Sequence, residues 1–117
     1  MRYYGLTLGL RADAGVLAQY REHHRNPWPE PLAGLRRVGV RQMRIFLLGR
    51  RLFMYMETTD DFDLIEGLAQ YMRENPRAVE WDRLMRAFQE PVADAAEGEW
   101  WAAMEPIFDL EEYLGAP

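Results

Sequence analysis

The sequence contains no cysteine and no lysine, and it has no long run of apolar residues. Without cysteine there is no disulfide framework, no thiolate nucleophile and no cysteine-ligated metal. All 14 cationic residues are arginines, and the net charge of −5 leaves no basic footprint for nucleic acid. No apolar run approaches the roughly 18 residues of a membrane-spanning helix, and the first residues lack the apolar core of a signal peptide. We therefore expect a soluble, cytoplasmic protein with neither nucleic acid nor membrane as a partner.

What the chain does contain is an ordinary globular composition. At 117 residues, with 49% hydrophobic and 13% aromatic residues, it is long enough to bury one core and too apolar to stay disordered. A single domain over residues 1–117 is predicted. No glycine-rich phosphate loop follows a predicted strand, and two adjacent histidines without a cysteine do not make a zinc site. We expect neither a cofactor nor a metal.

Alternating apolar side chains predict a strand over residues 2–10 and a hairpin over residues 43–48 and 51–57. Glycine comes first in the two-residue loop Gly49-Arg50, which favours a type II′ turn and fixes the register of the pair. One face of the hairpin is then wholly apolar and is expected to lie under helices. The other face is too aromatic to be left in water, so we expect a second subunit to cover it. The apolar face is made by Met43, Ile45, Leu47, Leu52, Met54 and Met56, and the mixed face by Arg44, Phe46, Leu48, Arg51, Phe53, Tyr55 and Glu57.

Helical spacing of apolar residues predicts two helices before the hairpin and two after it. Residues 89–99 are predicted to be a polar loop, and residues 106–110 a last extended segment. This order is that of the ferredoxin-like βαββαβ plan, an α+β fold with one antiparallel sheet covered on one side. The expected helix limits are Asp13 as cap to about His24, Pro29 to Gly39, Thr59 or Asp60 as cap to about Glu74, and a short helix after Asn75-Pro76.

Three residues that suit proton transfer on a polar, neutral ligand follow one another at four-residue spacing: Tyr20, His24 and Trp28. Tyr20 and His24 share one helical stripe with Leu17, so both are expected to face the sheet. A histidine titrates near neutral pH, a tyrosine can orient a hydroxyl, and a tryptophan offers a flat apolar wall. The alternatives are a histidine that only interacts with the dipole of its helix C-terminus and a tyrosine that only fills the core. His23 lies about 100° around the helix, so we expect one histidine in the pocket rather than two.

These residues are part of a longer pattern. Its segments are Tyr20-x3-His24-x3-Trp28-Pro29-Glu30, Gly39, Ile45-Phe46-Leu47, Leu52-Phe53-Met54-Tyr55-Met56-Glu57, Trp81-x3-Met85 and Ile107-Phe108-Asp109-Leu110. With these segments in this order, from about Tyr3 to Leu110, the chain resembles the L-rhamnose mutarotase family. The resemblance implies a dimeric α/β barrel built from ferredoxin-like subunits. It also implies a monosaccharide substrate, because the family interconverts the α and β anomers of a six-carbon deoxy sugar.

The resemblance also implies roles for single residues. His24 would transfer the proton, Tyr20 would contact the sugar through its phenol, and Trp81 would form part of the pocket wall. Rhamnose mutarotases usually carry a tyrosine where this chain has Met43 and a second tryptophan where it has Asp82, and both positions contact sugar in the family. The pattern Trp81-x2-Leu84-Met85-x2-Phe88-Gln89 is closer to relatives assigned to L-fucose. L-fucose and L-rhamnose both stay open as the substrate.

Two other functions are compatible with the same residues. A cofactor-independent monooxygenase on the same dimeric barrel would use a similarly placed histidine and tryptophan on a reduced aromatic substrate. A non-catalytic dimer that binds a small ligand would make no sugar exchange faster. Accelerated exchange between sugar anomers distinguishes the mutarotase from both.

Overall fold

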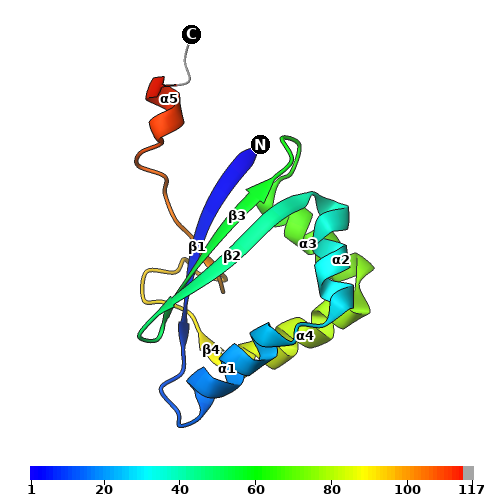
Figure 1. The fold of residues 1–117 in the computed structure, drawn as a ribbon, viewed down its shortest axis with the longest axis vertical. Coiled ribbons are helices and arrows are strands. Elements are labelled where there is room, and N and C mark those ends of the chain that lie inside the picture. The colour runs from blue at the N-terminus through cyan, green and yellow to red at the C-terminus, as the bar shows by residue number, and fades with distance from the viewer. Residues whose placement is uncertain (115–117) are drawn as a thin grey trace.

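The computed structural model describes residues 1–114 as one antiparallel sheet with helices packed against one of its faces (Figure 1). The strands are β1 (Arg2–Leu10), β2 (Val40–Leu48), β3 (Arg51–Thr58), β4 (Gln89–Glu90) and β5 (Ala102–Ala103), and the helices are α1 (Val16–Arg25), α2 (Pro29–Val38), α3 (Leu64–Glu74), α4 (Pro76–Arg86) and α5 (Leu110–Leu114). The sheet order is β2-β3-β1-β4, with β5 also paired to β1. This is the predicted α+β, ferredoxin-like arrangement. None of the helices among residues 1–114 is long and apolar enough to cross a membrane.

The hairpin of β2 and β3 has the predicted register, with Leu48 opposite Arg51. Its turn depends on Gly49, whose φ of +60° lies in the left-handed region that glycine enters at little cost. Strand β2 begins earlier than predicted, because its pairing continues past an irregularity between Val40 and Gln42. Such an irregularity breaks the alternation of side chains and hides the start of the strand from the sequence pattern.

One face of the hairpin is buried and the other is exposed, as predicted. Leu52, Met54 and Met56 are buried under the helices. On the opposite face Phe46 is 54% exposed and Phe53 38% exposed, and their rings stack with centroids 6.1 Å apart. No helix covers this face in the described part of the chain (Figure 1). The second subunit expected over it stays a prediction.

Helix α1 begins later than predicted. Gly15 precedes it with a φ of +83°, and no side chain caps its first turn. Asp13 lies outside the helix, in a turn where its carbonyl oxygen accepts a hydrogen bond from the Val16 amide at 3.3 Å. The chain turns at Gly15 before it enters the helix, so the prediction of Asp13 as cap is wrong.

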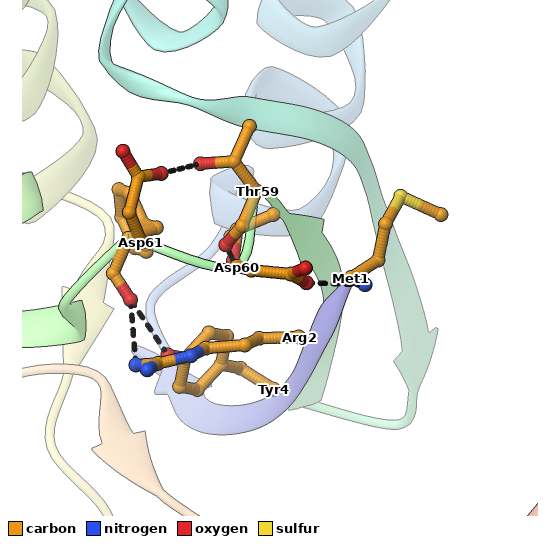
Figure 2. Close-up of polar contacts among 8 residues, drawn as sticks. Met1, Arg2, Tyr4, Thr59, Asp60 and Asp61 are labelled. Carbon is orange, nitrogen blue, oxygen red and sulfur yellow. Dashed lines mark hydrogen bonds and ion pairs between the residues drawn. The ribbon is translucent and has the colours of Figure 1, made fainter.

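The acidic run before α3 is used in three separate contacts, two of which are drawn in Figure 2. The Asp60 carboxylate pairs with the amino group of Met1, and the Asp61 carboxylate accepts a hydrogen bond from the Thr59 hydroxyl at 2.7 Å. Asp63 caps α3 by accepting a backbone amide hydrogen at 2.9 Å. The predicted caps, Thr59 and Asp60, are wrong because the helix begins only after Asp63, beyond their reach.

The C-terminal part departs most from the predictions. The predicted loop after α4 starts with a strand, because Gln89–Glu90 pairs with β1. The last strand is Ala102–Ala103 rather than residues 106–110, and the chain then leaves the body of the molecule toward α5 (Figure 1). Ile107 is 90% exposed and Phe108 68% exposed. The apolar side chains that predicted a strand here are therefore exposed to solvent in the single chain.

The core fills the space between the sheet and the helices in two neighbouring clusters. The first is centred on Leu8 and Leu52, with Tyr20 from α1 and Met85 from α4 packed against them. The second is centred on Met56 at the other end of the sheet, beneath α2 and α3. The first cluster carries the candidate site.

Candidate active site

Rings from α1, α4 and the start of α2 form a continuous aromatic row at the edge of the first core cluster. The centroids of Tyr20 and His24 are 4.4 Å apart, those of His24 and Trp81 5.7 Å, and those of Trp81 and Trp28 5.2 Å. The last two pairs meet edge to face, which is a preferred geometry for aromatic rings. Four of the six residues predicted to form the site are thus brought together.

His24 is held in one tautomer by its own helix. Its Nδ1 lies 2.9 Å from the backbone carbonyl oxygen of Tyr20. A carbonyl oxygen only accepts, so Nδ1 carries the hydrogen and the lone pair on Nε2 is left free. Shielding of the ring from water lowers the pKa of His24 below its ordinary value of 6.5, the bond to Tyr20 acts in the opposite direction, and the charge of His23 lowers it further. At neutral pH the ring is therefore an uncharged base that accepts through Nε2.

Tyr20 joins the core to the aromatic row. Its side chain is only 4% exposed, and its hydroxyl oxygen accepts a hydrogen bond from Nε2 of Gln89 at 2.9 Å. Burial raises the pKa of Tyr20 to about 12, while the bond from Gln89 acts in the opposite direction. The phenol stays protonated at neutral pH, so it serves as a hydrogen-bond donor and not as a base.

Trp28 contributes less free ring surface than the sequence implies. The guanidinium of Arg77 lies 3.9 Å from the centre of the Trp28 ring, and Trp81 contacts the same ring. Arginine over an aromatic face is a favourable cation–π arrangement. One face of Trp28 is therefore occupied by protein, and the binding of a ligand by Trp28 and Trp81 stays a prediction.

The two remaining predicted contacts are engaged elsewhere. Met43, on β2, packs against the second core cluster. Asp82, on α4, forms an ion pair with Arg86 at 2.8 Å. Burial, and after it the charge of Asp82, raises the pKa of Tyr71 to about 12, which places Asp82 near α3. Neither Met43 nor Asp82 takes part in the contacts of His24, and their role in binding stays a prediction.

The structure places further residues at the aromatic row, beyond the six predicted to form the site. The ring of His23 lies 5.6 Å from that of Phe88 and 6.2 Å from that of Trp81, so both histidines touch the aromatic row. Gln89 and Trp100 form the polar side of the site, with Trp100 Nε1 donating to Gln89 Oε1 at 2.8 Å. The tandem Trp100-Trp101 was a visible sequence signal. Gln89 appeared in the sequence only as the last residue of the L-fucose-like pattern after Trp81, and its hydrogen bonds to distant residues left no signal there.

Other parts of the surface fit a reaction site less well. A hollow of about 330 Å³ between α2 and α4 is lined by Glu30, Arg37, Asn75 and Arg77 among others, and it contains none of the predicted residues. Among residues 1–114, no three histidine, aspartate or glutamate side chains gather as metal ligands would. The strongest candidate remains the aromatic row, because it combines an uncharged base with a protonated phenol.

Sequence comparison matches nearly the whole chain. The family model described as L-rhamnose mutarotase matches residues 3–110. A UPF0734 protein from Dictyostelium discoideum is 40% identical over 111 residues, which cover 92% of this chain and 89% of that protein. An L-fucose mutarotase from Xanthomonas campestris is 37% identical over 108 residues, which cover 91% of this chain and 86% of that protein.

Two solved structures share the fold. An L-rhamnose mutarotase from Formosa agariphila aligns with a TM-score of 0.68 at 20% identity, over 93% of this chain and 98% of that chain. A type-II polyketide cyclase from Streptomyces glaucescens aligns with a TM-score of 0.61 at 24% identity, over 93% of this chain and 96% of that chain. At such identities the likeness shows the fold alone, and one fold can carry different reactions.

Proposed function

We propose, from the premise that this chain belongs to the L-rhamnose mutarotase family, that it interconverts the α and β anomers of a 6-deoxy-hexose through His24. The family makes it an isomerase that acts on carbohydrates. The observation that carries the role of His24 is its fixed tautomer, with Nδ1 bound to the Tyr20 carbonyl and Nε2 free to accept a proton. General acid–base catalysis needs such a group near its working pH.

Mutarotation breaks and remakes one bond of the sugar ring. Nε2 of His24 takes the proton of the anomeric hydroxyl, the bond between C1 and the ring oxygen breaks, and the electron pair goes to the ring oxygen. That oxygen receives a proton from the Tyr20 hydroxyl or from a water molecule, which gives the open-chain aldehyde. Rotation about the bond from C1 to C2 and the reverse proton transfers then close the ring with the hydroxyl on the opposite face of C1.

The catalysed rate is expected to fall on acidification, with a midpoint below 6.5. Protonated His24 has no lone pair, so activity is lost as the pH falls through its lowered pKa. The variant His23→Gln removes a neighbouring positive charge and is expected to move this midpoint upward. The measurement is the anomer exchange rate of both proteins from about pH 5 to 8, after subtraction of the uncatalysed rate. A profile without an acid limb would exclude His24 as the base, and equal midpoints would refute the effect of His23.

We propose L-fucose as the preferred sugar. The chain lacks the tyrosine and the second tryptophan of rhamnose mutarotases at Met43 and Asp82, and a relative named L-fucose mutarotase is 37% identical. Partners of ring hydroxyls decide between sugars that differ in configuration, and a site built for one commonly prefers it by roughly 10-fold or more. Saturation-transfer NMR on the anomeric protons, with catalytic amounts of protein, should show faster exchange for L-fucose than for L-rhamnose. The reverse order would contradict this preference and leave mutarotation in place.

We also propose that two copies pair through the open face of the sheet. Tyr3 and Tyr55 stack there with ring centroids 6.2 Å apart, beside the exposed rings of Phe46 and Phe53. Exposed aromatic surface of this kind marks an interaction site. When the same face of two copies is in contact, the result is a closed two-fold dimer. The apolar side chains of residues 107–114 also stand in solvent in the single chain, within reach of a partner rather than of its own core.

A further inference from the structure

We propose that Gln89 and Trp100 set the direction of the Tyr20 hydroxyl, so that Tyr20 donates its hydrogen to the sugar and not to the protein. Both act through Tyr20 and are therefore positioning residues. The assignment rests on the proposed mutarotase function, and it concerns two side chains to which the resemblance assigned no role.

The chain of hydrogen bonds has only one possible direction. The indole nitrogen of Trp100 is a donor without an acceptor, so the group of Gln89 that faces it at 2.8 Å must be the carbonyl oxygen Oε1. The amide nitrogen Nε2 of Gln89 then faces Tyr20 and donates to its hydroxyl oxygen at 2.9 Å. The flipped amide would set two donors against each other at the indole.

This direction decides what the Tyr20 hydroxyl can do. Its oxygen already receives the hydrogen of Gln89, so its own hydrogen must point away from Gln89. Within residues 1–114 the structure records no protein acceptor for that hydrogen. The ring of His24 lies 4.4 Å from that of Tyr20, and the free lone pair of Nε2 belongs to the same site. A sugar hydroxyl or ring oxygen at this place would meet one donor and one acceptor side by side.

The tertiary structure holds both positioning residues firmly. Gln89 is only 3% exposed, and its backbone is fixed in β4, opposite Leu10 of β1. The backbone carbonyl oxygen of Gln89 also accepts a hydrogen bond from Nε of Arg11 at 3.1 Å. The guanidinium of Arg86 lies 4.7 Å from the centre of the Trp100 ring and packs against the indole. A buried amide with this many contacts keeps its orientation when a ligand binds.

The test is a set of three variants compared with the unaltered protein. Gln89→Met keeps the length of the side chain but removes the donor, and we expect kcat to fall about fivefold to tenfold, with KM little changed, because one oriented hydrogen bond is lost. Tyr20→Phe should lower kcat by at least as much. The double variant should be no slower than Tyr20→Phe alone, since Gln89 acts only through the phenol. Losses that multiply would show that Gln89 is merely structural and would overturn the proposal.

A second substitution at position 89, which replaces the amide with a carboxylate, tests the direction of the hydrogen bond. In Gln89→Glu both carboxylate oxygens accept, so one would take the Trp100 hydrogen and the other would draw the Tyr20 hydrogen away from the sugar. We expect this variant to be slower than Gln89→Met, and equal activity to the unaltered protein would overturn the proposal. Gln70→Met, on the exposed side of α3, is the matched control and should retain full activity. Melting temperatures show that each variant is folded.

An NMR readout that needs no activity tests the hydrogen-bond chain itself. The chain has 4 tryptophans, and Trp100→Phe identifies which indole N–H signal belongs to Trp100. In Gln89→Met that signal should shift, because it has lost its acceptor, while the others stay; an unmoved signal would overturn the proposal. If the signal moves but the unaltered protein accelerates neither sugar, the proposed mutarotase function is wrong, while the hydrogen bonds among Trp100, Gln89 and Tyr20 are confirmed. If a sugar is accelerated and Gln89→Met is fully active, the role of Gln89 fails and the function stands.

Discussion

Replacing His24 with alanine is expected to slow anomer exchange about 10²–10⁴-fold, the range that general acid–base catalysis contributes. The alanine variant keeps Tyr20 and Trp81 but has no group to take the proton of the anomeric hydroxyl. The fold should persist, because His24 lies at the exposed end of α1 and fills no part of the buried core. Saturation-transfer NMR on the sugar anomers gives the rate, and circular dichroism checks the fold.

His23→Ala is the matched control for this change. It removes the neighbouring imidazole ring, which packs near the rings of Trp81 and Phe88 and for which the structure of residues 1–114 records no hydrogen bond to the helix backbone. We expect it to retain most of the activity at neutral pH, since His24 then stays an uncharged base. A folded His24→Ala protein with an undiminished rate would remove His24 from the mechanism. Equal losses in both variants would point to a shared structural effect on α1.

Phe46→Glu is expected to weaken the proposed dimer at least about 100-fold and to give monomers at micromolar concentration. Phe46 is 54% exposed in the single chain and stacks on Phe53 on the open face of the sheet. Burying one phenylalanine side chain stabilises by roughly 1.5–3 kcal/mol, and a two-fold interface contains the residue twice. The change also buries an unpaired negative charge in the interface twice. Sedimentation or light scattering over a range of protein concentrations measures the dissociation constant.

Ile65→Glu provides the control for this prediction. Ile65 is 83% exposed on α3, in the helical layer on the other side of the sheet (Figure 1). The same change of an apolar side chain to a carboxylate should leave the dimer intact there. An unaltered protein that is monomeric at all concentrations, or a Phe46→Glu variant that stays dimeric, would contradict the proposed interface.

Patterns within short stretches of sequence predicted most of the fold. The alternation in residues 43–57 and the glycine at position 49 fixed the hairpin and its register, since each depends on neighbours only a few residues apart. Pro29 and Gly39 bounded α2 for the same reason. The pairing of Tyr20 with His24 also followed from sequence, because residues four apart on a helix are always neighbours.

Local patterns failed where several choices had similar local energies. Asp13, Thr59 and Asp60 were all reasonable caps, but the caps depend on where the preceding turn ends, and that is set by Gly15 and by the contacts around β1. The apolar alternation of residues 106–110 is typical of a strand. It formed none, because the pairing with β1 ends at Ala102–Ala103 and the chain then leaves the sheet, so residues 106–110 have no partner strand.

The sequence by itself determined the family, the order of the elements and the presence of a histidine one turn after a tyrosine. Only the tertiary structure decided which way the polar groups of the site point. Gln89 meets Tyr20 across 69 positions of sequence and Trp100 across 11, after β4 has paired with β1. The direction of a hydrogen bond depends on which donor faces which acceptor, and distant parts of the chain meet only when the sheet and the helices have packed.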